Sequence, residues 1–121
     1  MNCQTVAILT TDKIAEDINK RLDKFPEEKS YIKIKKLRAN VNLYYWKYEP
    51  FFNCINNRLC LTDLLSNYDN DKEEGYKLLA YGDDDFSEIR TNIVGSEMFE
   101  DYCMEYRFNF LDELKRNNHI D

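Results

Sequence analysis

The sequence predicts an α+β fold. In this fold a mostly antiparallel sheet of about four to six strands packs with one helix near the N-terminus and a long helix near the C-terminus. The 121 residues are the size of one domain, residues 1–121, and 43% of them are hydrophobic, which suffices for a core. Helical periodicity is strong only towards the two ends of the chain. The region between them contains short aromatic and β-branched runs, without the regular strand–helix alternation of a doubly wound sheet.

The first predicted elements are a short strand and a helix. Residues 5–9, Thr-Val-Ala-Ile-Leu, form a short apolar run that is typical of a strand. Thr10 and Thr11 can then cap a helix over residues 12–25, which Pro26 ends because proline cannot continue a helix. The apolar stripe of this helix consists of Ile14, Ile18, Leu22 and Phe25.

Residues 31–48 fit two periodicities, that of a helix and that of a strand. From Asn40 onward the run Val-Asn-Leu-Tyr-Tyr-Trp-Lys-Tyr is rich in aromatic residues, which favour pleated surfaces. We therefore predict strands over residues 31–37 and 40–48, the second of which ends before Pro50. Four shorter elements follow: a tight hairpin turn at Asn56-Asn57, a brief helix over residues 63–68 capped by Thr62, and strands over residues 75–81 and 87–94.

The last predicted element is the long helix over residues 96–116. Its apolar positions recur every three or four residues, as in a helix that packs one stripe against a core. Several acidic residues fall off this stripe, so the outer face of the helix is expected to be negative. The stripe consists of Phe99, Cys103, Tyr106, Phe110 and Leu114.

The two halves of the chain carry opposite charge. Residues 1–60 contain 11 Lys and Arg against 7 Asp and Glu, a net charge of +4, and residues 61–121 contain 6 against 16, a net charge of −10. Much of the negative charge falls in two predicted loops, which either keep the protein soluble or form an electronegative surface for a basic partner. The acidic residues of these loops are Asp69, Asp71, Glu73, Glu74, Asp83, Asp84, Asp85 and Glu88.

An aromatic cluster supplies a second set of candidate partner contacts. On a strand, Tyr44, Trp46 and Tyr48 lie on one face and Tyr45 lies on the other. Tyr and Trp are strong interface anchors because they combine a large rigid ring with a polar group. The three rings on one face either meet a partner or pack in the core against the long helix.

Two alternative functions draw on parts of the same sequence. The carboxylates of residues 83–88 could hold a divalent cation for phosphoryl-transfer or nuclease-like chemistry. The segment that starts at Asp69, however, lacks the glycine and the glutamate that an EF-hand loop needs at its sixth and twelfth positions. The basic stretch Lys29–Arg38, together with the aromatic residues, could bind nucleic acid. The net charge of −6 argues against direct nucleic-acid binding.

The residue types of the common catalytic centres are scarce. The only histidine, His119, lies near the C-terminus, where chains fray. The four cysteines contain no C-x-x-C pair that would suggest a zinc site, and three glycines cannot supply a Gly-rich phosphate loop. We therefore predict no catalytic residues, no cofactor and no metal.

The expected location is the cytoplasm. The chain has no run of 18 apolar residues and no basic leader followed by an apolar segment, so neither a membrane partner nor export is predicted. The cysteines are then expected to be reduced. The excess of Asn, Ile, Lys and Tyr follows A/T-rich codons, which suggests a bacterial or phage source.

The sequence thus predicts a small, acidic, non-enzymatic protein that binds another protein. The more specific hypothesis is an inhibitor of the immunity or anti-defence type, which occupies a basic site on a nuclease or another nucleic-acid-handling protein. Self-association is a further alternative, in which the positive half of one copy meets the negative half of another in a homodimer.

Overall fold

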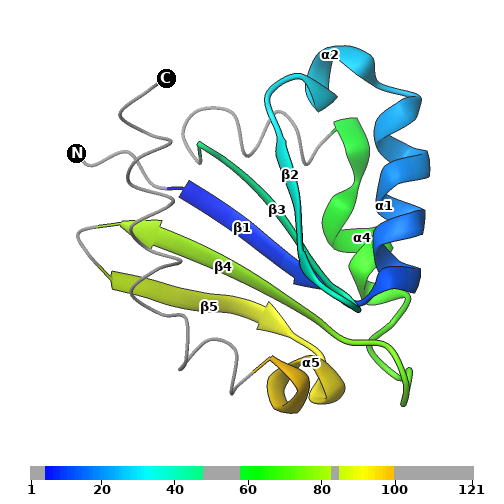
Figure 1. Cartoon of the computed structure of the whole chain (residues 1–121), viewed down its shortest axis with the longest axis vertical. Coiled ribbons are helices and arrows are strands. Elements are labelled where there is room, and N and C mark those ends of the chain that lie inside the picture. The colour runs from blue at the N-terminus through cyan, green and yellow to red at the C-terminus, as the bar shows by residue number, and fades with distance from the viewer. Residues whose placement is uncertain (1–4, 48–57, 83–84, 100–121) are drawn as a thin grey trace.

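The computed structural model of the protein describes residues 5–47, 58–82 and 85–99. Within these ranges five strands form one antiparallel sheet, and helices pack on it (Figure 1). The strands are β1 (Thr5–Thr10), β2 (Lys33–Arg38), β3 (Val41–Lys47), β4 (Tyr76–Gly82) and β5 (Asp85–Thr91). The helices are α1 (Asp12–Asp23), α2 (Pro26–Lys29), α4 (Leu61–Ser66) and α5 (Ile93–Met98).

The strand order is β2-β3-β1-β4-β5, and each neighbouring pair is antiparallel. β1 and β2 therefore run parallel, with β3 between them and α1 in their connection. β3 and β4 are related in the same way, with β1 between them and α4 in their connection. This is the β-α-β-β-α-β connectivity of ferredoxin-like sheets, to which β5 adds a strand at one edge. Such an architecture leaves function open, because it hosts many unrelated activities.

β1 lies at the centre of the sheet, where it pairs with β3 on one side and with β4 on the other. A strand that is covered on both faces has to be apolar throughout, and Val6, Ala7, Ile8 and Leu9 are all buried. Successive side chains of a strand point to opposite faces. Val6 and Ile8 accordingly join one core cluster, whereas Ala7 and Leu9 join another.

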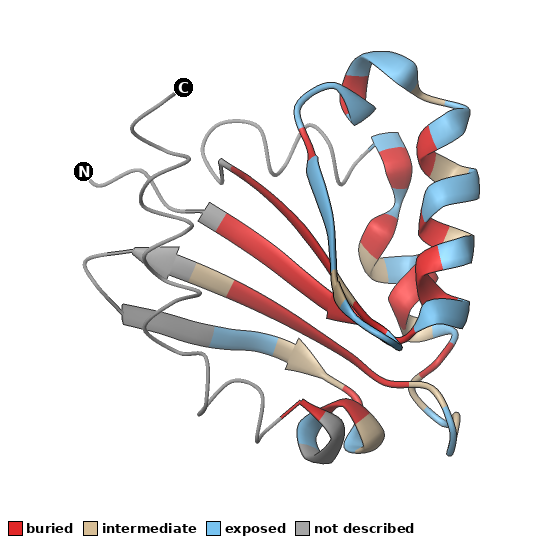
Figure 2. Ribbon diagram, in the orientation of Figure 1, coloured by how far each residue is buried: buried red, intermediate tan, exposed pale blue. Residues whose placement is uncertain are grey.

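Helices α1 and α4 cover the face of the sheet that carries the larger core cluster (Figure 2). α1 directs Ile14, Ile18 and Leu22 towards the sheet and leaves its charged residues outside, so buried and exposed positions alternate along its ribbon. α4 contributes Leu64 and Leu65 to the same cluster. Burial of each such side chain stabilises the fold by about 1.5–3 kcal/mol, which fixes both helices on this face.

The opposite face of the sheet carries a smaller apolar cluster. Leu43 and Tyr45 of β3 and Leu79 of β4 are buried there beside the β1 residues. Phe99, which directly follows α5 and is 0% exposed, packs into the same cluster. The strands between the two clusters are therefore buried on both sides.

The predicted antiparallel sheet and the N-terminal helix are confirmed. α1 ends at Asp23, two residues earlier than expected, and Pro26 begins α2. Proline suits the first position of a helix for two reasons. The N–H group at that position has no partner within the helix, and the fixed φ angle of proline already has a helical value. Thr11 is the N-cap residue of α1, as expected, but its hydroxyl accepts no N–H of the helix and instead donates to Glu74.

The boundaries of two shorter elements differ from the prediction. The strand predicted over residues 87–94 is wrong at its end, since β5 stops at Thr91 and α5 begins at Ile93. Asn92 causes this change, because its Oδ1 accepts the backbone N–H of Gly95 at 2.6 Å and so caps the helix. The brief helix expected over residues 63–68 is present as α4, shifted by two residues.

The predicted helix over residues 96–116 is not supported. α5 is a short helix that ends at Met98, and residues 100–121 lie outside the described residues. The Asn56-Asn57 turn also lies outside them. Most of the acidic residues predicted on the outer face of that helix therefore lie outside the described residues as well.

Candidate functional site: a basic edge strand

Asp69, the first residue of the predicted acidic loop, is bound within the molecule. Its Oδ2 lies 2.6 Å from Arg90 Nη2, and its Oδ1 accepts the Tyr76 hydroxyl at 2.6 Å. Arg90 Nε donates to the same hydroxyl at 2.8 Å, so the three side chains form a closed network. The hydrogen bonds from Tyr76 and Arg90 lower the pKa of Asp69, while burial is the main cause that raises the pKa of Tyr76.

Asp71 and Glu74 also have structural partners. Asp71 Oδ1 accepts the backbone N–H groups of Glu73 at 2.8 Å and of Glu74 at 3.0 Å, which closes the turn and lowers the pKa of Asp71. Glu74 Oε1 accepts the hydroxyl of Thr11 at 2.6 Å, which joins the loop to the start of α1. Glu73 is exposed. Three of the four carboxylates in this loop therefore hold the loop in place.

The second acidic segment, residues 83–88, begins directly after β4. The first loop leads into Tyr76, and β4 ends at Gly82 after 7 residues, a span of about 20 Å. Glu88 in β5 pairs with Lys77, with 2.8 Å between Oε2 and Nζ. The remaining acidic positions, Asp83, Asp84 and the side chain of Asp85, lie outside the described residues. Of the second segment, the backbone of Asp85 thus lies opposite Gly82 at the end of β4, whereas Glu88 lies opposite Leu79 in the middle of that strand.

Tyr44 and Trp46 are core residues. They are 1% and 3% exposed and lie on the face covered by α1 and α4, so they offer no surface to a partner. The Tyr44 hydroxyl donates to Asn19 Oδ1 at 2.8 Å, with the Ala15 carbonyl oxygen at 3.1 Å, and burial raises the pKa of Tyr44. Tyr48 lies outside the described residues. Of the two interpretations left open by the sequence, packing in the core applies to these two rings, with α1 and α4 as the covering helices.

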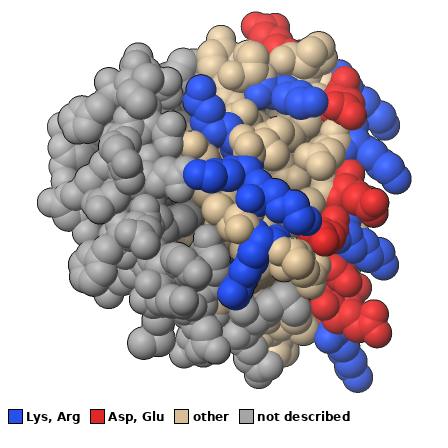
Figure 3. All heavy atoms as spheres, viewed as in Figure 1, with Lys and Arg blue, Asp and Glu red and all other residues tan. Residues whose placement is uncertain are grey.

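The basic stretch forms an exposed edge of the sheet. β2 stands at one end of the strand order, and all its residues except Leu37 are exposed. Figure 3 shows Lys and Arg side chains gathered over β2, whereas along α1 they alternate with Asp and Glu. The exposed basic residues in β2 and just before it are Lys29, Lys33, Lys35, Lys36 and Arg38.

The register between β2 and β3 divides these basic residues between the two faces. Lys33 and Lys35 lie opposite β3 residues of the smaller core cluster. Lys36 lies on the helix-covered face, where its Nζ is 2.6 Å from an oxygen of Asp12 and lowers the pKa of that carboxyl. A register shift after Lys36 sets Arg38 opposite another residue of the smaller cluster. Three cations thus share one side of the edge.

Two large side chains with apolar surface are exposed at the same edge. Tyr31, just before β2, is 48% exposed, and Ile34 within β2 is 46% exposed. An edge strand that only has to avoid pairing is protected by charges such as lysines. The register places Ile34 opposite Tyr44, on the helix-covered face with Lys36, so β2 exposes an apolar side chain on one face and three cations on the other.

Asn92 is the residue that the sequence prediction missed. It is 4% exposed, and its amide nitrogen donates to the carbonyls of Tyr68 at 3.0 Å and of Glu74 at 2.8 Å. Its Oδ1 accepts the N–H groups of Tyr76 at 3.2 Å and of Gly95 at 2.6 Å. The preference of Asn for helix N-caps could have indicated it, but the prediction of a continuous strand obscured that signal.

Two further sequence predictions concern metal binding and a membrane-spanning helix. Within the described ranges no three His, Cys, Asp or Glu side chains are placed to hold a metal ion. The phosphoryl-transfer alternative depends on Asp83 and Asp84, which lie outside them, so it stays a prediction. None of the helices in residues 5–47, 58–82 and 85–99 is long and apolar enough to cross a bilayer.

The basic edge of β2 and the internal partners of the acidic residues are the observations on which a functional argument can rest. No protein-family model matches the chain, and neither a curated protein nor a solved structure is significantly similar to it.

Proposed function

We propose that the protein is a non-enzymatic binding protein whose exposed edge strand β2 takes up an acidic, extended segment of a partner protein. The observation that carries the proposal is the coincidence, at one sheet edge, of exposed basic side chains with exposed Tyr31 and Ile34. An extended segment that adds to an edge gains main-chain hydrogen bonds, and its alternate side chains give specificity. Lys33 and Lys35, two residues apart on one face, suit carboxylates two residues apart on the segment.

A protein partner accounts for the site better than nucleic acid does. Tyr44 and Trp46, which would have stacked on bases, are buried, and the net charge of −6 repels a polyanion at a distance. A second copy is disfavoured at this edge, because pairing β2 with β2 brings lysines near lysines. The homodimer alternative would therefore need another surface.

The proposal keeps the class of function that the sequence predicts and changes the charge of the partner. Asp69, Asp71, Glu74 and Glu88 have partners within the molecule and hold loops and strands in place, so the choice of β2 rests on its exposure at a sheet edge. An inhibitor of the immunity or anti-defence type is one form that such a binding protein can take. Its target would then present an acidic segment instead of a basic site.

A designed peptide tests this proposal directly. A labelled peptide of about ten residues that alternates Glu with Val has the extended shape and the carboxylate spacing that β2 is proposed to recognise. We expect saturable binding to the full chain, measured by fluorescence anisotropy, that weakens as salt rises. The Lys33→Glu/Lys35→Glu variant should weaken binding by about five- to tenfold or more, since two favourable pairs become repulsive.

A charge-matched variant provides the control. Lys13→Glu/Lys72→Glu changes the net charge equally at exposed positions outside β2 and should bind like the parent. Equal losses in both double variants would reduce the effect to general charge attraction and overturn the proposal. Preference for a single-stranded oligonucleotide over the peptide, with the same dependence on Lys33 and Lys35, would replace it with the nucleic-acid alternative.

A further inference from the structure

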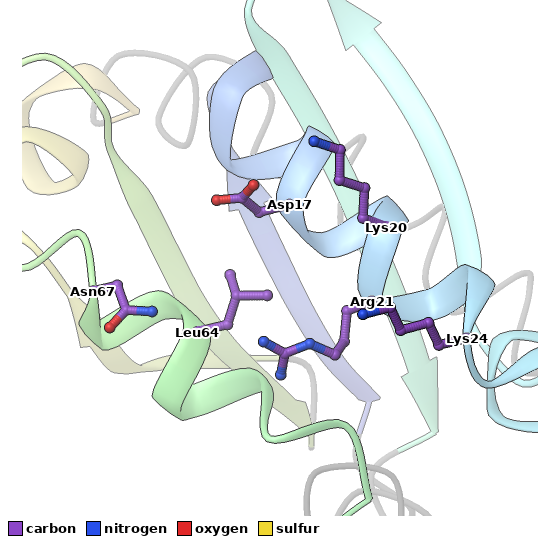
Figure 4. Close-up of a pocket in the computed structure, with 6 residues that line it drawn as sticks. All are labelled: Asp17, Lys20, Arg21, Lys24, Leu64 and Asn67. Carbon is purple, nitrogen blue, oxygen red and sulfur yellow. The ribbon is translucent and has the colours of Figure 1, made fainter.

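A hollow lies between the outer sides of α1 and α4, away from β2. Its volume is about 220 Å³. Figure 4 shows the guanidinium of Arg21 and the amide of Asn67 reaching into this space from the two helices, with Leu64 between them. The lining residues are Asp17, Lys20, Arg21 and Lys24 of α1, Leu64 of α4, and Asn67 at the C-cap of α4.

The lining carries an excess of positive charge. The lining contains three cations, Lys20, Arg21 and Lys24, and one carboxylate, that of Asp17. This carboxylate accepts a hydrogen bond from the hydroxyl of Tyr68. Both Lys20 and Lys24 are exposed, and neither has an ion-pair partner among the residues that the structure describes. The hollow is thus more positive than the remaining outer surface of α1, where charges of both signs alternate (Figure 3).

Arg21 is held in position for a ligand. Its Nη1 donates to the backbone carbonyl of Leu59 at 2.5 Å, which ties the guanidinium to the segment that leads into α4. This bond uses one of the five N–H donors of the planar fork, a shape that matches the oxygens of an anion. Cations in the last turn of α1 also offset the negative end of the helix. That role requires neither a hollow nor the facing amide of Asn67.

We propose that this hollow binds a phosphoryl anion, either free phosphate or the phosphate group of a larger molecule. Arg21 donates from a fixed position, Lys20 and Lys24 supply charge, and the Asn67 amide donates from the opposite helix. The volume is below the range of about 300–1,000 Å³ that is typical of sites for drug-sized molecules, so it suits the anionic group alone. The inference does not depend on the role proposed for β2, since the two sites share no residue.

Titration with inorganic phosphate tests the site. The full chain is titrated at constant ionic strength with chloride as the reference anion, and NMR follows Arg21 Nε–Hε and the Asn67 side-chain amide. We expect saturable shifts of these two groups with phosphate and not with chloride. Lys20→Gln/Lys24→Gln should raise the Kd by about two- to thirtyfold, because removing one exposed pair changes affinity by about 1.4- to 5-fold.

A single variant and a phosphate ester complete the design. Lys13→Gln removes an exposed lysine of α1 that does not line the hollow, and its Kd should equal that of the parent. Shifts that fail to saturate, or equal losses in the Lys13 and the double variants, would overturn the proposal. Glycerol phosphate distinguishes the two sources: tighter binding of the ester indicates a group on a larger molecule, and tighter binding of phosphate indicates the free anion. Neither result bears on the peptide experiment at β2.

Discussion

Replacement of Asn92 by alanine should cost more stability than any exposed substitution in the same region. Its side-chain amide uses both donor hydrogens and accepts two N–H groups, and the residue is 4% exposed. These bonds connect three elements: the loop after α4, the start of β4 and the first turn of α5. Without the amide, the carbonyl of Glu74 and the N–H groups of Tyr76 and Gly95 lose these bonds, whereas the carbonyl of Tyr68 keeps the N–H of Asp71 as a partner.

The expected loss in the free energy of unfolding follows from the four hydrogen bonds of the Asn92 side chain. Each neutral bond contributes about 0.5–1.5 kcal/mol net, so Asn92→Ala should lower the free energy of unfolding by about 2–6 kcal/mol. Native domains are stable by only about 5–15 kcal/mol, so this loss is a large fraction of the total. The separations of 2.6–3.2 Å are ordinary for such bonds, which supports counting all four.

Asn92→Asp gives the prediction a pH signature. The new carboxylate would replace the amide nitrogen that faces the carbonyls of Tyr68 and Glu74. Burial and these two dipoles raise the pKa of the new group in the folded state above its unfolded value of about 3.9. Relative to the parent, the variant is then most stable below pH 4, where the protonated acid can donate, and this relative stability falls as the pH rises towards the folded pKa.

Urea unfolding measures both variants. Trp46 is the only tryptophan and is 3% exposed, so its fluorescence reports loss of the core, and circular dichroism reports loss of the sheet and the helices. The control is Asn70→Ala, an exposed asparagine in the loop after α4 that Asn92 contacts, which should change stability by less than about 0.5 kcal/mol. A loss below about 1 kcal/mol for Asn92→Ala, or a loss equal to that of the control, would refute the reasoning.

Two further predictions use the same unfolding assay. Gly95→Ala would push its new Cβ into the carbonyl oxygen of Tyr76, so it should cost about 1–3 kcal/mol, and an unchanged variant would show that β4 and α5 do not approach so closely. Asp69→Asn should cost about 0.2–1 kcal/mol at pH 7, because the pair with Arg90 is more than a third exposed on both sides. Since hydrogen bonding lowers the folded pKa of Asp69, this contribution is present above the unfolded pKa of about 3.9 and is lost as the pH falls through the folded pKa. A pH-independent difference between the two proteins would contradict it.

The sequence predicts an element well where its pattern has only one physical meaning. β1 is a continuous apolar run, which suits a central strand, and α1 has a clear helical stripe, which suits a helix on one face of a sheet. β3 is different, because Val41–Lys47 has large side chains at both alternating sets of positions. Only the observed sheet order and the two core clusters establish that both faces of β3 are covered.

The role of the first acidic loop was harder to predict, because the partners of its carboxylates lie far away along the chain. Glu74 meets Thr11 across 63 positions, and Asp69 meets Arg90 across 21. Counting charges along the sequence treats these carboxylates as solvent-exposed, whereas the fold uses them to fix loops.

The basic stretch of the first half lies at one edge of the sheet, whereas the charged side chains described at the other edge, Glu88 and Arg90 of β5, are of opposite sign. The basic stretch occupies β2 at one edge, and Glu88 lies on β5 at the other. Four strand spacings separate these edges, a distance of about 19 Å, which exceeds the screening length of about 8 Å at physiological salt. The acidic residue of β5 therefore cannot neutralise β2 within one molecule, and it already pairs with Lys77. The acidic partner proposed for β2 therefore rests on the position of exposed basic side chains at one edge of the sheet, and not on the net charge of the chain.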